Sequence, residues 1–326
     1  MKRGKLLACI ALTLVAGGIA PQTGVSQDKI RIGVPLFPTV AFPAMIAQEK
    51  GLFEKYGLKA EIIRINSEPT TYQALISGDI DATSGAPTGL VQSNLQGVSV
   101  VSLGSWDNLV SYTMTTREKI QDLAQLKGKK IGINRLGGKS SLILRVMLEV
   151  AGLDVNRDVT LLQLGGSQER LAALVRGGID AAPVDFAFEP KMKQLGFHLL
   201  TGSKTPFMNA PMVVKASSVQ ANRGKWLRFV RAYLDATQYI VANRAASLEL
   251  LRRGLGLEDK ETLEHTYEQM RARADLDLIA PPAAEDNLIK MMTYIDKRAA
   301  SVDKSKLVDY SLVRELLQNK TAPVRK

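Results

Sequence analysis

The sequence predicts an α/β protein built as two lobes of similar construction. Residues 75–87 (LISGDIDATSGAP) recur 99 positions later as residues 174–186 (LVRGGIDAAPVDF), and the same offset aligns residues 32–34 with residues 131–133. Predicted strands also alternate with predicted helices, which is typical of α/β folds. The period is too long for a solenoid, and 326 residues exceed the usual size of one core. One copy of the repeat in each lobe explains all three observations.

The first copy begins with a predicted strand at residues 30–34 and one helix over residues 41–56. An alternating pattern predicts a second strand at residues 60–66. Residues 67–70 (SEPT) then have the serine and proline typical of a helix start. We expect this helix to end at Gly78, with a positive φ.

A short strand from Ile80, a helix over residues 87–96 and a strand at residues 98–103 complete the first copy. This βαβ alternation predicts a parallel sheet with helices on its faces. Residues 109–115 are expected to leave the lobe as an extended segment. The second copy repeats the pattern, and residues 211–215 are expected to form the returning connection.

Further elements are predicted in the second copy and in the C-terminal part. In the second copy they are strands 130–134, 160–164, 181–184 and 197–200, a helix that opens at 135–141 and ends at Ala151, and a helix over 168–176. The C-terminal part is helical over 226–241, 245–253, 258–272, 284–298 and 311–318. The apolar stripe from Trp226 to Val241 predicts a helix face that packs in the core.

Residues 1–26 differ from the rest of the chain. Lys2, Arg3 and Lys5 precede an uncharged run over residues 6–20, which small and polar residues follow. A basic head and an apolar run of ~15 residues are typical of an export signal, and the run is short for a membrane span. We therefore expect a periplasmic mature chain, whose net charge falls from +11 to +8 when those three basic residues leave.

The mature chain offers little for catalysis. Cys9 is the single cysteine and lies in the signal, which excludes a disulfide or a cysteine metal site from the remainder. His198 and His265 are far apart and are expected to be surface or structural histidines. Basic residues are dispersed without aromatic partners, which argues against nucleic-acid binding. We expect no catalytic residue, no metal, no cofactor and a monomer.

Five segments in order resemble a known family. The most specific is AQEKGLFEKYGL at residues 47–58, followed by ALISGDIDA at residues 74–82. The others are residues 123–130, which end in Lys-Gly-Lys-Lys, residues 165–167 and residues 174–181. Together they resemble the solute-binding proteins of ABC importers, of the nitrate/sulfonate/taurine and thiamine-pyrimidine-precursor (NMT1/THI5-like) type.

The resemblance implies a type II periplasmic-binding-protein fold, in which two crossing strands join two βα lobes and the ligand lies in the cleft. By position, residues 28–113 plus 212–326 would form lobe 1, and residues 114–211 lobe 2. It also implies a substrate-binding component that binds a small anion (sulfonate, nitrate, carboxylate or a related compound). Such a protein closes as a clamp and delivers its ligand to an ABC permease and its ATPase.

The ligand is expected beyond the carboxyl ends of the strands, where helix N-termini present unpaired N–H groups. Such helix starts lie at residues 37–42, 67–70, 84–88, 137–141, 165–168 and 183–186. The candidate ligand-binding residues are Thr39, Phe42, Ser67, Thr70, Ser84, Thr88, Trp106, Gly138, Lys139, Ser140, Gly166, Ser167 and Asp185. Each could instead cap or pack an ordinary helix.

Individual candidates keep a second interpretation. Lys139 either adds charge beside a helix start or is solvated, because its GGKS context lacks the first glycine of a phosphate-binding loop. Trp106 either stacks on a ligand or packs in the core. Asp185 either binds a ligand amine or hydroxyl or caps the next turn. Glu68 and Asp107 give the candidate ring charges of both signs, so the sequence does not require an exclusively anionic ligand.

Two other functions remain open. Thiamine-pyrimidine-precursor binding or a synthase-like enzyme shares this fold by resemblance, although the cysteine-rich motif and donor histidines of the synthases are missing. A stand-alone ligand-sensing lobe pair would need a DNA-binding or membrane-spanning part, which the sequence after residue 20 does not predict. Importer genes beside this one would favour transport, whereas turnover of a bound compound would favour the enzyme.

Overall fold

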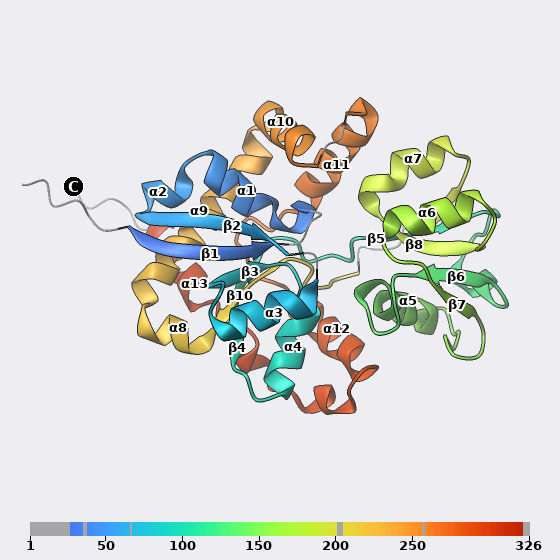
Figure 1. The fold of residues 1–326 in the computed structure, drawn as a ribbon, viewed down its shortest axis with the longest axis horizontal. Helices are drawn as coiled ribbons and strands as arrows, with labels where there is room; N and C mark the ends of the chain where they lie inside the picture. Colours follow the sequence, from blue (N-terminus) through green and yellow to red (C-terminus); the bar gives the residue numbers. More distant parts are fainter. Residues whose placement is uncertain (1–26, 35–37, 66, 201–204, 256–257, 322–326) are drawn as a thin grey trace, which may run out of the picture.

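The computed structural model describes residues 27–34, 38–65, 67–200, 205–255 and 258–321. The export signal predicted at residues 1–26 lies outside these ranges. Two five-stranded sheets lie apart along the long axis of the molecule, each with helices around it (Figure 1). Their strand orders are β2-β1-β3-β10-β4 and β7-β6-β8-β5-β9. None of the helices in the described part is long and apolar enough to cross a membrane.

The strands of the first sheet are β1 (Asp28–Val34), β2 (Leu58–Arg64), β3 (Ala82–Ser84), β4 (Val100–Ser105) and β10 (Pro211–Lys215). Those of the second sheet are β5 (Tyr112–Thr116), β6 (Lys130–Ile133), β7 (Thr160–Gln163), β8 (Ala181–Asp185) and β9 (His198–Leu200). The helices are α1 (Phe42–Glu49), α2 (Leu52–Lys55), α3 (Glu68–Ser77), α4 (Pro87–Leu95), α5 (Lys139–Val150), α6 (Ser167–Val175), α7 (Glu189–Gln194), α8 (Ala216–Ala221), α9 (Arg223–Ala242), α10 (Arg244–Leu255), α11 (Lys260–Arg273), α12 (Pro282–Thr293) and α13 (Ser311–Thr321). The 3-10 turns are η1 (Pro38–Ala41), η2 (Leu123–Leu126), η3 (Phe186–Phe188), η4 (Lys297–Ser301) and η5 (Lys304–Lys306).

The sequence repeat is also a structural repeat. Strands β2-β1-β3 and β7-β6-β8 have the same order and the same parallel pairing. Ile32 pairs with Ala82 in the first sheet, and Ile131 pairs with Ala181 in the second, which is the same register shifted by the repeat offset. The α/β architecture predicted from the repeat is therefore confirmed.

The repeated aspartates have a structural role. Asp81 Oδ2 accepts a hydrogen bond from the backbone N–H of Arg31 at 2.8 Å, and Asp180 Oδ2 accepts one from that of Lys130 at 2.8 Å. Each carboxylate thereby satisfies a strand N–H that has no ladder partner at that point. The identical residue in the two copies is explained by strand pairing.

Both sheets are mixed, which corrects the expectation of a purely parallel sheet. Strand β10 runs antiparallel to β3 and β4, and β5 runs antiparallel to β8 and β9. Each of these strands enters its sheet from the other half of the molecule and therefore runs in the reverse direction. Residues 211–215, expected to be a connection, form strand β10.

The prediction of a single helix over residues 41–56 is wrong, because the helix is interrupted at Gly51. Gly51 has φ 61°, a left-handed conformation that glycine adopts without a steric penalty, and it separates α1 from α2. The positive φ expected for Gly78 is confirmed at 90°, and its repeat partner Gly177 has φ 76°. Helix α9 also buries the apolar stripe predicted from the sequence, in which the ring centres of Phe229 and Tyr233 lie 4.8 Å apart.

Two chain segments cross between the sheets, over residues 106–111 and 205–210. They run antiparallel, with Phe207 N donating to Asn108 O at 2.9 Å and Asn209 N donating to Asp107 O at 3.0 Å. The crossings therefore precede the segments expected from the sequence, 109–115 and 211–215, most of which form strands β5 and β10, and the two crossings are bonded to each other.

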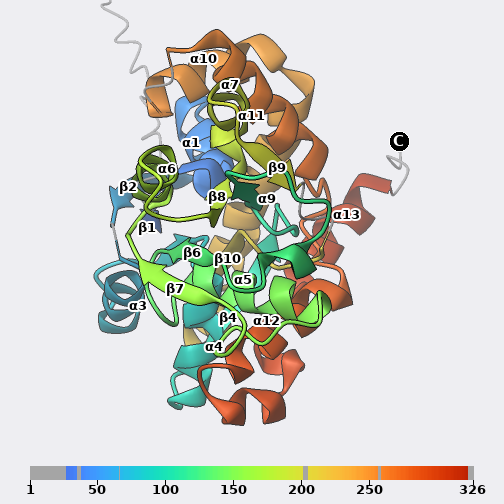
Figure 2. The same ribbon diagram turned by 90° about the vertical axis from the view of Figure 1, so that its right-hand side faces the viewer.

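C-terminal helices add further contacts between the halves. Phe186 and Ala187, which follow strand β8 of the second sheet, share a core with Tyr267 and Met270 of α11. Helix α12 packs against both α4 and α5. In Figure 2 the second sheet faces the viewer, and α11 lies beside α7. The crossings are thus not the only physical link between the two halves.

Candidate functional site

A cavity of about 220 Å³ lies between the two sheets. The first-sheet half, the second-sheet half and a crossing segment all contribute to its walls. The lining residues are Val40, Ile65, Glu68, Thr71, Thr83, Ala86, Pro87, Tyr112, Lys139 and Asn209. The wall therefore combines four apolar side chains with a carboxylate, an ammonium, a phenol, an amide and two hydroxyls.

A second cavity of about 390 Å³ adjoins the first, since Glu68 and Lys139 line both. Its other lining residues are Ser67, Pro69, Thr88, Gln92, Asn134, Arg135, Gly137 and Gly138. Ser67 and Thr88 stand at the starts of α3 and α4, and Gly138 precedes α5. Helix starts from both halves meet at these two cavities, which we call the central cavities.

Lys139 is the first residue of α5, and its side chain lies in the central cavities. Its Nζ donates a hydrogen bond to Asn209 Oδ1 and lies 5.7 Å from the ring centre of Tyr112. Burial lowers the pKa of the Lys139 ammonium, while the charges of Asp185, Asp107 and Glu68 oppose this shift. An ammonium at a helix start is suited to binding an oxyanion.

Glu68 is the first residue of α3 and lies at the N-terminus of α4. Its Oε1 accepts from Thr88 Oγ1 at 2.6 Å and from the backbone N–H of Gly89 at 2.7 Å. Glycine at position 89 allows the two helices to lie this close, because a Cβ there would lie 2.3 Å from the ring of Tyr72. One carboxylate therefore interacts with the partial positive charge of two helix starts.

Thr83 lines the 220 Å³ cavity and has an unpaired side-chain oxygen. Its side chain is 1% exposed, and Oγ1 has no hydrogen-bond partner among the described residues. Buried hydroxyls are normally hydrogen-bonded, so this one is an exception beside the cavity.

A buried ion pair supports the crossing segments behind Lys139. Arg273 at the end of α11 contacts Asp107 at 2.9 Å, with the two side chains 8% and 5% exposed. Asn209 Nδ2 donates to Asp107 Oδ2 at 2.7 Å. Contacts therefore run from Arg273 through Asp107 and Asn209 to Lys139, linking α11 to the cavity wall.

The helix start at residues 165–168 is organised around Arg170. This arginine is 1% exposed and donates to the carbonyl oxygens of Pro183 and Gly165 and to Ser167 Oγ. Ser167 Oγ also accepts from the backbone N–H of Asp185 at 3.2 Å. These groups are bonded to one another, and Arg170 supports Tyr112 with its guanidinium 5.8 Å from the ring centre.

The predicted site residues fall into two groups. Ser67, Thr88, Gly138 and Lys139 line the central cavities. Residues that line neither cavity are Thr39, Phe42, Thr70, Ser84, Trp106, Ser140, Gly166, Ser167 and Asp185. Their direct contact with a ligand stays a prediction.

Several residues of the second group have other partners. Ser84 Oγ and Trp106 Nε1 both donate to the carbonyl of Val40, at 3.3 and 2.7 Å, and so position a residue of the cavity wall. Ser140 Oγ donates to Asn134 Oδ1 at 2.8 Å and accepts from its backbone N–H. Phe42 is fully buried in the core.

Other predicted residues act as caps. Asp185 Oδ1 accepts from the backbone N–H of Ala187 at 3.1 Å, the capping alternative proposed from the sequence. Burial raises the pKa of this carboxyl, and the cap and the charge of Lys139 oppose the shift. Thr70 is exposed, and its backbone N–H donates at 3.4 Å to Ser67 Oγ, which is the side-chain cap of α3.

Sequence reasoning missed Thr83, Tyr112 and Asn209 as lining residues. Thr83 lies in the repeat at the end of a predicted strand, and that position was the available signal. Tyr112 lies in the segment expected to leave the first lobe, and Asn209 lies just before the expected returning connection. A residue of a crossing segment is close to both halves, and that position alone could have marked them.

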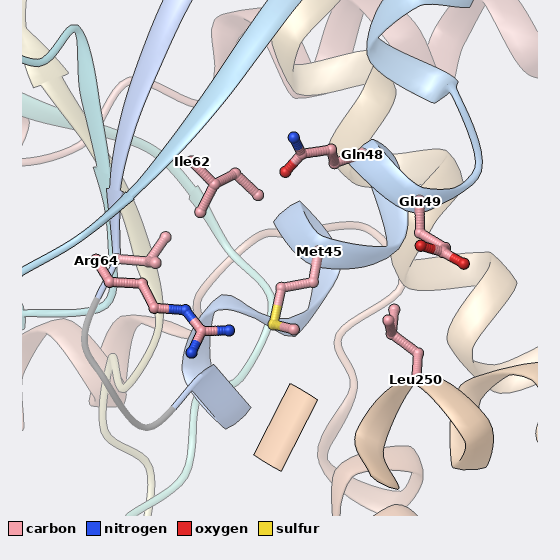
Figure 3. Close-up of a pocket in the computed structure, with 7 residues that line it drawn as sticks. Met45, Gln48, Glu49, Ile62, Arg64 and Leu250 are labelled. Carbon is pink, nitrogen blue, oxygen red and sulfur yellow. The ribbon is translucent and has the colours of Figure 1, made fainter. Parts of the chain in front are cut away.

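A third cavity, of about 480 Å³, lies on the first-sheet half. Its walls are Val34, Met45, Gln48, Glu49, Ile62, Arg64 and Leu250, and the side chains converge from β1, β2, α1 and α10 (Figure 3). Glu49 is already paired with Arg253 at 2.8 Å. This cavity does not join the two halves, and the candidate site is therefore the central cavities.

The model of the NMT1/THI5-like proteins matches residues 39–247, more than half of the chain. The chain belongs to the NMT1/THI5-like family. A family relative in Bacillus subtilis, named as an aliphatic sulfonates-binding protein, is 24% identical over 339 residues and covers 98% of both chains. Another, a 4-amino-5-hydroxymethyl-2-methylpyrimidine phosphate synthase of Aspergillus parasiticus, is 24% identical over 229 residues, 64% of this chain and 65% of that one.

Solved structures establish the fold of this NMT1/THI5-like protein. The periplasmic aliphatic sulphonate binding protein of Escherichia coli aligns with a TM-score of 0.71 and 19% identity, over 83% of this chain and 88% of that one. The predicted periplasmic-binding-protein fold is therefore confirmed.

Proposed function

We propose that this protein is the substrate-binding component of an ABC importer, and that it binds a small acidic compound in the central cavities. The observation that carries the proposal is the position of Lys139. Its ammonium lies at a helix start in a cavity that residues of both halves enclose. A helix N-terminus with a neighbouring ammonium suits carboxylates and sulfonates.

We further propose that residues 28–113 plus 212–326 act as one lobe and residues 114–211 as the other. A ligand that contacts Lys139 on one side and the Glu68 wall on the other stabilises the closed arrangement in proportion to its differential affinity. The permease and ATPase are the partners of the closed form. Because α11 and α12 contact the second half, opening separates or carries these helices as well as bending the crossing segments.

We propose binding rather than catalysis, which the relative named as a sulfonates-binding protein supports. They contain no group of three or more histidine, cysteine or acidic side chains placed to hold a metal ion. Cys9, the single cysteine of the chain, lies in the proposed export signal. The synthase relative makes turnover the second candidate, and a mature chain in the periplasm is part of the binding proposal.

The test is ligand binding to the exported protein. We expect alkanesulfonates or short carboxylates to raise its melting temperature, because a ligand at a hundredfold its Kd stabilises by about 2.7 kcal/mol. Lys139→Met should abolish the shift, whereas Lys59→Met, at an exposed position of β2, should retain it. An equal shift in both variants, or consumption of a bound compound, would contradict the proposal.

A further inference from the structure

Helix α11 of the first half meets the start of α7 in the second half (Figure 2). His265 lies in α11, and Glu189 is the first residue of α7. His265 Nε2 lies 3.1 Å from Glu189 Oε2, and the two side chains are 20% and 6% exposed. This His265–Glu189 contact therefore joins the two halves through side chains that are largely shielded from water.

The second sheet fixes the carboxylate of Glu189. Its Oε1 accepts a hydrogen bond from Thr113 Oγ1 of β5, and Thr113 is buried as well. Burial raises the pKa of Glu189, but its contacts with His265 and Thr113 lower that pKa by more. A charged carboxylate is therefore attached to the second half, with its other oxygen, Oε2, next to His265 of the first half.

The imidazole of His265 is the unsatisfied side of this contact. Its Nε2 is buried and has no hydrogen bond of good geometry to a described residue. A ring nitrogen without a proton would place two acceptors 3.1 Å apart, whereas a proton on Nε2 makes the same contact attractive. A positive charge on the ring strengthens the interaction with a carboxylate further. Histidine is the side chain that ordinarily changes its charge between about pH 5 and 8.

The other charged groups around the contact are lysines, arginines and acidic residues. Helix α10, the turn η3 and helix α7 all pack on α11, and η3 carries no charged side chain. The charged residues that the other elements carry around the contact are Lys191 and Lys193 of α7, Arg244 of α10, and Asp259, Glu261, Glu264 and Glu268 of α11. Side chains of these types ordinarily keep their charges between about pH 5 and 8, so the titrating side chain of the contact is the histidine.

We propose that the His265–Glu189 contact is a pH-sensitive link between the lobes, which favours the closed arrangement when His265 is protonated. This inference rests on the lobe movement of the proposed function, but it requires no particular ligand. His265 belongs to residues 212–326 of one lobe and Glu189 to residues 114–211 of the other, so separation of the lobes breaks the contact. Because the protonated pair forms in the closed arrangement, closing takes up protons, and the closed fraction rises as the pH falls.

The experiment measures the distance between the lobes in the exported protein without ligand. Nitroxide labels are attached at Glu61→Cys in β2 and Gln168→Cys in α6, which are exposed positions on opposite halves, and Cys9 is the single native cysteine. Electron paramagnetic resonance then gives the ratio of closed to open molecules. We expect this ratio to rise about fivefold from about pH 8 to about pH 5.5, because a hydrogen bond to a charged group exceeds a neutral one by about this factor.

Variants separate the titration from the packing. His265→Gln cannot gain a charge, and Glu189→Gln keeps an acceptor for Thr113 but removes the negative charge. Either substitution should make the ratio independent of pH. His198→Gln, at the other histidine of the chain, is the matched control and should keep the wild-type pH dependence.

The outcomes distinguish this inference from the function on which it rests. A ratio that is independent of pH in the wild type refutes the link, and that result is expected if α11 moves together with the second half. A pH dependence that survives in His265→Gln or Glu189→Gln refutes it as well. If ethanesulfonate closes the lobes and a change of pH does not, only the link is refuted. If neither ethanesulfonate nor propionate binds while the pH still shifts the ratio, the link is supported and the proposed acidic ligand is refuted.

Discussion

Replacing Asp107 by asparagine tests the support behind the site. Asp107 is 5% exposed and accepts hydrogen bonds from Arg273, from Asn209 and from the backbone N–H of Leu109. Arg273 is 8% exposed, and its other acceptors are the carbonyls of Leu109 and Val110. The substitution keeps the shape of the side chain and removes its charge, so the guanidinium loses its counterion.

The expected loss of unfolding free energy is about 3 kcal/mol or more, since removing one partner of a buried pair typically costs 3–5 kcal/mol. The pair lies between crossing residue 107 and the last residue of α11, so the crossing should loosen. Asn209 also loses a charged acceptor, and Lys139 should then bind acidic ligands more weakly.

Urea unfolding followed by tryptophan fluorescence and by circular dichroism measures this loss, with coincident transitions as the check on two-state behaviour. Arg273→Met and the double variant complete the cycle, and we expect a coupling energy of about 2 kcal/mol. Asp286→Asn is the matched control. Its partner Lys304 lies 2.6 Å away, but the two side chains are 57% and 45% exposed, so it should cost about 1 kcal/mol at most. An Asp107→Asn cost no larger than that of the control would refute the reasoning.

Two further predictions concern the repeat and α11. Gly78→Ala and Gly177→Ala should each lower the unfolding free energy by about 1 kcal/mol, because both glycines have a positive φ. The control Gly178→Ala should change it by no more than about 0.5 kcal/mol. Three equal results in urea melts would refute this prediction. Burial raises the pKa of Glu189, but its contacts with His265 and Thr113 outweigh burial and hold the pKa below the usual 4.5. This stabilisation is present above about pH 4.5 and is lost as the pH falls through the lower pKa of the folded state. Glu189→Gln should therefore flatten the acid side of a plot of unfolding free energy against pH. An unchanged slope would contradict this prediction.

The sequence predicted the repeated architecture because its signals are local. Alternating apolar residues mark the strands, and a glycine such as Gly78 marks a helix end whatever lies around it. The break at Gly51 was missed because the residues on both sides of it fit one helix pattern. The two antiparallel strands depend on where the chain crosses between sheets, which local patterns do not state.

The candidate site was harder to predict because its key contacts are between distant residues. Glu68 caps a helix that starts about twenty residues later, and its own position suggests only a cap of α3. Arg170 lies in a helix that begins with polar residues, yet its side chain is almost fully buried. It donates hydrogen bonds to the carbonyl oxygen of Pro183 and to Ser167 Oγ. His265 had no apparent role in the sequence and lies 3.1 Å from Glu189.

The contact of α11 with the second half also constrains the order in which the chain can fold. Phe186 and Ala187 share a core with residues near position 230 and with Tyr267 and Met270 of α11. During synthesis from the N-terminus, the strands of the second sheet are complete long before α11 can cover this apolar surface. Folding intermediates that lack the C-terminal third should therefore expose Phe186, and chaperone binding to such intermediates should decline once α11 has docked.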